Sequence, residues 1–225
     1  MEPFSLLLKP VSFRCNLNCR YCFYLPKQEL FGAAAHRMSA GTLEAVVRSY
    51  LSCPMEQYQF GWQGGEPTLA GVGFFRQAVE FQRRYGRNAA VFNALQTNGT
   101  RLDDEWGRFL HENRFLTGIS IDGPAALHDR YRCYADGRGS HAEAVRGLGV
   151  LKRHRVEYNV LTLVSAANQE HPLDVYHYLR EQGVRFQQYI DCVEFDRSGC
   201  LQPFALTPGK WGEFLCRIFD EWYRY

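Results

Sequence analysis

The chain has 225 residues, of which 46% are hydrophobic, and its formal net charge at neutral pH is +2. This apolar content supports a folded core and excludes a disordered chain, and the small net charge argues against a nucleic-acid partner. No segment approaches the roughly 20 apolar residues of a membrane helix, and the first residues lack the features of a secretory signal. We therefore expect a cytoplasmic protein, without a membrane partner, of one large domain or a domain and a half.

Segments with strand and helix periodicity alternate along the whole chain. The expected strands are Phe4–Leu8 continuing into Val11–Phe13, Tyr58–Trp62, Val91–Gln96, Leu116–Ile121, Glu157–Val164 and Arg185–Ile190. The expected helices are Ala40–Leu51, Phe74–Tyr85, Asp103–Glu112 (with Asp103 or Asp104 near the N-cap), Ala142–His154, Pro172–Gln182 and Pro208–Tyr225. This alternation predicts βαβ units and an α/β fold with a parallel sheet. Ligands of such folds bind beyond the carboxyl ends of the strands.

Three cysteines follow the first expected strand, in the run Cys15-Asn-Leu-Asn-Cys19-Arg-Tyr-Cys22. The spacing offers three thiolates in one loop, one fewer than a fully ligated [4Fe–4S] cluster uses, so one iron would stay open to a small molecule. Structural zinc needs four closed ligands, and no fourth Cys or His stands at a paired spacing. A redox or metal-binding loop of another kind is the alternative. The other five cysteines are expected to be core or incidental thiols.

Turn-forming and polar residues follow the next expected strands. Gln63-Gly-Gly-Glu-Pro67 combines two glycines, which let backbone approach a ligand, with a carboxylate suited to an ammonium group. Thr97-Asn-Gly99 and Ser120-Ile-Asp122-Gly123 offer groups that hydrogen-bond a ribose or a carboxylate. The basic groups of His128-Asp-Arg-Tyr-Arg132 suit a carboxylate. Ordinary turns and solvated charges are the alternatives for all four segments.

The cysteine pattern, with Tyr21 as the aromatic residue before Cys22, resembles the signature of radical S-adenosylmethionine (SAM) enzymes, and the glycine run resembles their GGEP motif. The resemblance implies a partial (β/α)6 TIM-like barrel. It implies a [4Fe–4S] cluster held by Cys15, Cys19 and Cys22, with SAM on the open iron. It also implies SAM contacts from Tyr24, Gln63, Gly64, Gly65, Glu66, Ser120, Asp122 and Leu161. Core packing is the alternative role for Tyr24 and Leu161, and loop stabilisation is the alternative for Asp122.

Longer runs resemble one branch of that family, the anaerobic sulfatase-maturating enzymes. They are Phe60–Gly71, Gln187–Glu194, Pro203–Pro208 and Trp211–Leu215. The resemblance implies that a 5′-deoxyadenosyl radical removes a hydrogen from Cβ of a Cys or Ser in an unfolded or nascent sulfatase, which becomes Cα-formylglycine. An electron donor such as flavodoxin or ferredoxin is implied as well. The residues do not identify the base that takes the substrate proton.

Members of that branch carry a C-terminal SPASM extension with auxiliary clusters. The cysteines after the middle of this chain do not match that set, so we expect residues 1–225 to form a radical SAM core domain without the extension. Two other functions stay open. One is a radical SAM peptide maturase that forms thioether or carbon–carbon crosslinks in a ribosomal peptide. The other is a truncated, non-catalytic core that binds a cluster or metal without turnover.

Overall fold

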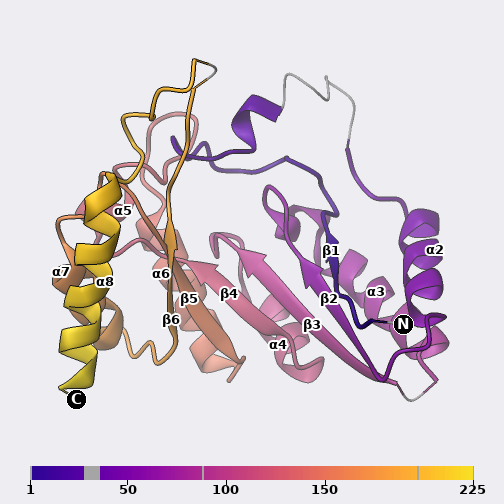
Figure 1. Cartoon of the computed structure of the whole chain (residues 1–225). Helices are drawn as coiled ribbons and strands as arrows, with labels where there is room; N and C mark the ends of the chain where they lie inside the picture. Colours follow the sequence, from indigo (N-terminus) through magenta and orange to yellow (C-terminus); the bar gives the residue numbers. More distant parts are fainter. Residues whose placement is uncertain (1, 28–35, 88, 197, 225) are drawn as a thin grey trace. The chain divides into compact units, whose positions relative to one another are not determined.

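A computed structural model describes residues 2–27, 36–87, 89–196 and 198–224 (Figure 1). Within this part of the chain the strands are β1 (Leu6–Leu8), β2 (Gln57–Trp62), β3 (Ala90–Thr97), β4 (Leu116–Ser120), β5 (Tyr158–Val164) and β6 (Gln187–Asp191). The helices are α2 (Ala40–Leu51), α3 (Val72–Tyr85), α4 (Asp104–Glu112), α5 (Ala125–His128), α6 (His141–Arg153), α7 (Pro172–Glu181) and α8 (Pro208–Tyr223). Two 3-10 turns, η1 (Leu25–Lys27) and η2 (Pro67–Ala70), complete the described elements.

The strands follow one another in the sheet in the order of the sequence. Strand β1 pairs with β2, β2 with β3 and β5 with β6, each in parallel, with Leu6 opposite Phe60 in the first of these pairs. A helix follows each strand from β2 onward, as right-handed βαβ crossovers require. The predicted α/β fold, a parallel sheet of the partial TIM-like barrel type, is confirmed.

The segment before the cysteine loop differs from the prediction. Only Leu6–Leu8 form a strand, and Leu7 is 59% exposed, so this strand is not buried on both faces. The predicted strand Val11–Phe13 is wrong, because these residues form a turn in which Ser12 adopts a φ of 55°. Pro10 has no N–H for a strand ladder and favours the turn. The short helix α5 was not predicted, and Tyr225 lies outside the described residues.

Local sequence signals position the helix ends. The Ser39 hydroxyl caps α2 by accepting a hydrogen bond from the Thr42 N–H, and the Asp103 carboxylate caps α4 through the Trp106 N–H. Helices α7 and α8 begin with Pro172 and Pro208, where a missing N–H costs nothing. The predicted starts of these four helices therefore agree with the structure to within one residue.

The first of two compact units consists of Met1–Asn16, Tyr24–Gly118 and Arg146–Tyr158. Its core is aromatic and fully buried. The rings of Trp62 and Phe75 lie 5.3 Å apart, and Phe75 in turn contacts Trp106 at 5.3 Å and Phe115 at 6.4 Å. Because strand β2 supplies Trp62 and helix α3 supplies Phe75, this packing fixes the carboxyl end of β2, where the GGEP-like motif begins.

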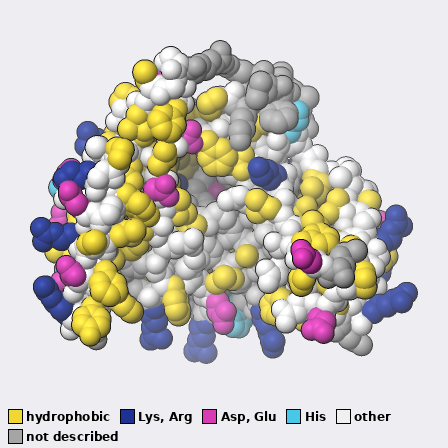
Figure 2. All heavy atoms as spheres, in the orientation of Figure 1, with side chains coloured by type: hydrophobic (Ala, Val, Ile, Leu, Met, Phe, Trp, Pro, Cys, Tyr) yellow, Lys and Arg dark blue, Asp and Glu magenta, His cyan; other side chains and the backbone are white. Residues whose placement is uncertain are grey.

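The second unit consists of Leu17–Phe23, Ile119–Val145 and Asn159–Tyr225. A buried cluster of Val164, Tyr176, Leu206, Phe214 and Ile218 joins the end of β5 to α7 and α8, which lie side by side (Figure 1). Helix α8 also carries exposed apolar side chains, and Figure 2 shows hydrophobic atoms along it. Among the described residues, no helix has the length and apolar character that crossing a membrane requires.

Candidate cofactor site

The three cysteines of the C-x3-C-x2-C motif lie in the loop after β1. Cys15 belongs to the first unit, whereas Cys19 and Cys22 belong to the second. Cys19 is buried, Cys15 and Cys22 are half-buried, and no disulfide joins any of the eight cysteines. The Cys22 N–H donates to the Cys19 carbonyl at 2.9 Å, which closes a turn between the two thiols. Among the described residues, no three His, Cys, Asp or Glu side chains are grouped to hold a single metal ion.

Glycine in the GGEP-like motif allows a close approach to the segment before Cys15. The Gly65 N–H donates to the Ser12 carbonyl and the Glu66 N–H to the Arg14 carbonyl, both at 2.8 Å. A Cβ at Gly65 would lie 2.1 Å from the Arg14 oxygen, and Gly64 adopts a φ of 132° that favours glycine. The sequence predicted that these glycines admit a ligand. In the structure, the space beside Gly65 is filled by the chain's own backbone.

The carboxylate of Glu66 is engaged by the protein itself. It accepts hydrogen bonds from the Thr68 N–H (2.9 Å), the Thr68 hydroxyl (2.6 Å), the Thr97 hydroxyl (2.8 Å) and the Asn98 N–H (2.7 Å). Three of these donors reach Oε1, and the Asn98 N–H alone reaches Oε2. Glu66 is 1% exposed, and burial raises its pKa against the opposing effect of those donors. Its side chain therefore ties the β2 end to the β3 end.

An amide at the end of β3 reaches the first cysteine. The Asn98 Nδ2 group donates to the Cys15 sulfur at 3.7 Å and to the Asn16 side-chain oxygen at 3.0 Å. Hydrogen bonds to sulfur favour the thiolate and raise the reduction potential of a cluster bound to it. The sequence analysis assigned Asn98 a ribose or carboxylate contact and missed this role. Through its N–H bond to Glu66, Asn98 also joins the segment that follows β3 to the GGEP-like motif.

Tyr24 and Gln63 are the remaining predicted residues of this unit. Tyr24 is buried and lies under the ammonium of Lys9, which is 5.1 Å from its ring centroid. Gln63 is half-buried, and its N–H extends the β1–β2 pairing by donating to the Leu8 carbonyl at 2.9 Å. Both residues therefore flank the strand end from which the cysteine loop departs.

In the second unit, the predicted residue Asp122 follows β4. Its carboxylate accepts hydrogen bonds from the Tyr21 hydroxyl, from Arg132 Nε at 2.8 Å and from the Leu163 N–H at 3.0 Å. Ser120, at the end of β4, is half-buried. Leu161, on β5, is also half-buried, and its carbonyl accepts the Ile121 N–H at 3.1 Å. The structure thus places Asp122 beside Tyr21, the residue of the cysteine loop that stands between Cys19 and Cys22 in the sequence.

In the segment from His128 to Arg132, His128 is buried and Asp129 and Arg132 are half-buried, whereas Arg130 is exposed. His128 Nδ1 accepts the Asp122 N–H at 3.2 Å, so its Nε2 carries the proton toward the Ser140 hydroxyl at 3.1 Å. Burial lowers the pKa of His128 to about 3, so this imidazole is neutral at physiological pH. The Asp129 carboxylate accepts the N–H groups of Ser140 and His141 at the start of α6. His128 therefore supports the β4 end, whereas Asp129 binds the start of α6.

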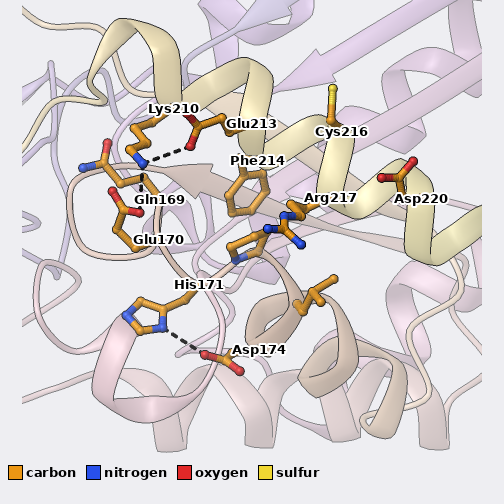
Figure 3. Close-up of a pocket in the computed structure, with 12 residues that line it drawn as sticks. Gln169, Glu170, His171, Asp174, Lys210, Glu213, Phe214, Cys216, Arg217 and Asp220 are labelled. Carbon is orange, nitrogen blue, oxygen red and sulfur yellow. Dashed lines mark hydrogen bonds and ion pairs between the residues drawn. The ribbon is translucent and has the colours of Figure 1, made fainter.

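A cavity of about 640 Å³ lies between the starts of α7 and α8 in the second unit (Figure 3). Several of its charged groups pair with one another. Lys210 contacts Glu213 at 2.9 Å and Glu170 at 3.2 Å, and His171 contacts Asp174 at 2.9 Å. Its lining residues include none of the cysteines of the motif and none of the predicted cofactor contacts.

The donor chemistry of the loop fits an iron–sulfur cluster. The loop holds three cysteines that form no disulfide, and the Asn98 amide donates a hydrogen bond to one of them, Cys15. Backbone groups of a glycine turn lie against the segment that leads to the first thiol. The ligation of a [4Fe–4S] cluster by these three thiols stays a prediction.

Comparisons with known proteins identify the family of this chain. Residues 10–179 match the family model of the radical SAM superfamily. The serine-type anaerobic sulfatase-maturating enzyme of Bacteroides thetaiotaomicron is 39% identical over 98% of this chain and 58% of its own length. The cysteine-type enzyme of Clostridium perfringens is 37% identical over 99% of this chain and 61% of its own length. The chain thus spans about three-fifths of these relatives.

A solved structure of native anSMEcpe with bound AdoMet and Cp18Cys peptide superposes on this chain with a TM-score of 0.91 at 37% identity. That superposition covers 99% of this chain and 60% of the solved chain. Family match, fold and cysteine motif lead to one conclusion: the chain belongs to the radical SAM superfamily.

Proposed function

We propose that this chain is the radical SAM core of an anaerobic sulfatase-maturating enzyme, which oxidises a Cys or Ser of a sulfatase to Cα-formylglycine. The observation that carries the proposal is the breadth of the similarity. Curated serine-type and cysteine-type maturating enzymes are 34–39% identical to at least 98% of this chain. Because both types match at similar identity, the proposal covers both substrates and does not choose between them.

The proposed cofactors are a [4Fe–4S] cluster on Cys15, Cys19 and Cys22 and SAM on the open iron. Together they supply a 5′-deoxyadenosyl radical, and that chemistry belongs to the cofactors. The chain's own residues hold and orient them. Asn98 donates to the Cys15 sulfur, while Glu66 holds Asn98 through its backbone N–H. We assign the SAM contacts to backbone of the Gln63–Glu66 turn and to Ser120, Leu161 and Tyr24.

The proposed partners follow from the same function. They are an unfolded or nascent sulfatase polypeptide and a one-electron donor such as flavodoxin or ferredoxin. A reducing, cytoplasmic location suits eight cysteines without a disulfide.

The test is anaerobic reconstitution of the chain with iron and sulfide, followed by reduction in the presence of SAM and a sulfatase peptide. Two peptides that differ only in Cys or Ser at the target position are compared, and an Ala peptide is the control. Formation of 5′-deoxyadenosine together with the mass of formylglycine supports the proposal and identifies the substrate type. If neither peptide changes mass while deoxyadenosine forms, sulfatase maturation by residues 1–225 is refuted.

A further inference from the structure

The carboxylate of Asp122 lies at the centre of a buried polar cluster within the second unit. Three donors converge on it: the Tyr21 hydroxyl, Arg132 Nε and the Leu163 N–H. The side chains of Arg132 and Asp122 are only 12% and 4% exposed. Such a buried pair needs well-made hydrogen bonds, since desolvation of both charges opposes it.

The main-chain groups of Asp122 are engaged as well. Its N–H donates to His128 Nδ1 at 3.2 Å, and its carbonyl accepts a hydrogen bond from Asn168 Nδ2 at 3.1 Å. The same Asn168 amide group reaches the Leu163 carbonyl at 3.0 Å. His128 and Asn168 therefore fix the backbone of Asp122, and its carboxylate is directed at protein donors.

Tyr21 links this cluster to the cysteine loop because it stands between Cys19 and Cys22 in the sequence. The Arg132 guanidinium also lies over the Tyr21 ring, 5.4 Å from its centroid. Two backbone hydrogen bonds add to the attachment: the Arg20 N–H donates to the Tyr131 carbonyl at 3.0 Å, and the Asn18 N–H to the Cys133 carbonyl at 2.7 Å. The loop segment is thus attached to residues that follow β4 at Asn18, Arg20 and Tyr21.

We propose that Asp122 is a positioning residue, which with Arg132 and through the Tyr21 hydroxyl holds Cys19 and Cys22 in place for the cluster. This replaces its predicted role as a SAM contact. The inference rests on the proposed cluster site, but not on the identity of the substrate. Asp122 acts on the cofactor through Tyr21.

The first test uses Tyr21→Phe in the metal-free chain and follows alkylation of each cysteine by mass spectrometry. Burial raises the pKa of the Tyr21 phenol well above its ordinary value, so the phenol is neutral and its removal changes no charge. A change in Cys19 reactivity therefore reports movement of the loop. We expect Cys19 to react about tenfold faster than in the unaltered chain, as loss of a hydrogen bond to a buried charge implies. Exposed Cys200 is the internal standard.

Asp122→Asn is the second variant, and Asp129→Asn is its matched control. Asp129 lies in the same unit and accepts backbone N–H groups, but its hydrogen bonds run to α6. We expect Asp122→Asn to speed Cys19 alkylation and to lower the iron bound per chain after reconstitution, with Asp129→Asn unchanged in both. Circular dichroism confirms that each variant is folded.

Two results would overturn the proposal. One is Cys19 reactivity within twofold of the unaltered chain in both Tyr21→Phe and Asp122→Asn. The other is an Asp122→Asn variant whose Cys19 alkylation and iron content match the unaltered chain but whose SAM affinity falls tenfold or more. That result would make Asp122 a cofactor ligand. Neither readout requires a sulfatase or turnover, so failure of sulfatase maturation would leave this test intact.

Discussion

Gly65→Ala tests whether the glycine turn supports the cysteine loop as the structure indicates. The new Cβ would lie 2.1 Å from the Arg14 carbonyl oxygen and 2.4 Å from the Phe13 carbonyl oxygen. Both contacts are with backbone, so no side-chain rotation relieves them. The turn and the segment before Cys15 must separate by more than an ångström to reach ordinary contact distances.

The cost follows from the groups that would separate. Overpacking of this kind costs about 1–3 kcal/mol. The hydrogen bonds Gly65 N–H to Ser12 and Glu66 N–H to Arg14, both 2.8 Å long, would stretch or break, at about 1 kcal/mol each. We therefore expect a loss of about 3–5 kcal/mol in the free energy of unfolding, a large part of the stability of an ordinary domain.

Urea unfolding of the metal-free chain measures this loss, and Gly149→Ala is the matched control. Gly149 lies within α6, and a Cβ there meets no atom within 4 Å. That variant should gain up to about 1 kcal/mol, because alanine favours the helix. Gly65→Ala should also bind less iron after reconstitution. If Gly65→Ala unfolds within about 0.5 kcal/mol of the unaltered chain and binds iron normally, the reasoning about the turn is wrong.

Two further substitutions probe buried titratable groups, each by urea unfolding. Glu66→Gln places an amide against four donors, so at least one of them loses its acceptor. The free energy of unfolding should fall by about 1–3 kcal/mol. A loss below about 0.5 kcal/mol would contradict the hydrogen bonds assigned to Glu66. The folded-state pKa of His128, about 3, is below its ordinary value of 6.5, so the unfolded chain binds more protons as pH falls below 6.5. At pH 5 this costs roughly 2 kcal/mol relative to pH 7. His128→Asn, whose amide keeps a donor and an acceptor, should remove that acid sensitivity, and an unchanged difference between the two pH values would refute the assignment.

Much of the fold is predictable from the sequence because its elements are strongly periodic and clearly capped. The helix Ala40–Leu51 is identical in the prediction and the structure, and Asp103 caps α4 as predicted. The turn at Val11–Phe13 was missed because three residues with apolar ends resemble a short strand, whereas the positive φ of Ser12 depends on tertiary contacts.

The candidate site is predictable at the level of motifs but not of side-chain partners. The sequence places Glu66 and Asp122 at strand ends, and the structure finds both there. Their predicted assignment to SAM came from their charge and from the family resemblance, and neither shows which protein donors surround a carboxylate. Which donors reach each carboxylate depends on packing between segments as far apart as Tyr21 and Asp122, and no local pattern records that. The contact between Asn98 and Cys15 was not predicted for the same reason, since it joins residues 83 positions apart.

The central claim, that three cysteines of one loop hold the cluster at which SAM is cleaved, is tested most directly by single substitutions to alanine. Each variant is reconstituted anaerobically with iron and sulfide, reduced, and assayed for 5′-deoxyadenosine. We predict that Cys15→Ala, Cys19→Ala and Cys22→Ala each abolish cluster binding and SAM cleavage, whereas Cys53→Ala and Cys216→Ala retain both. Continued cleavage of SAM by any of the three loop variants would contradict the account.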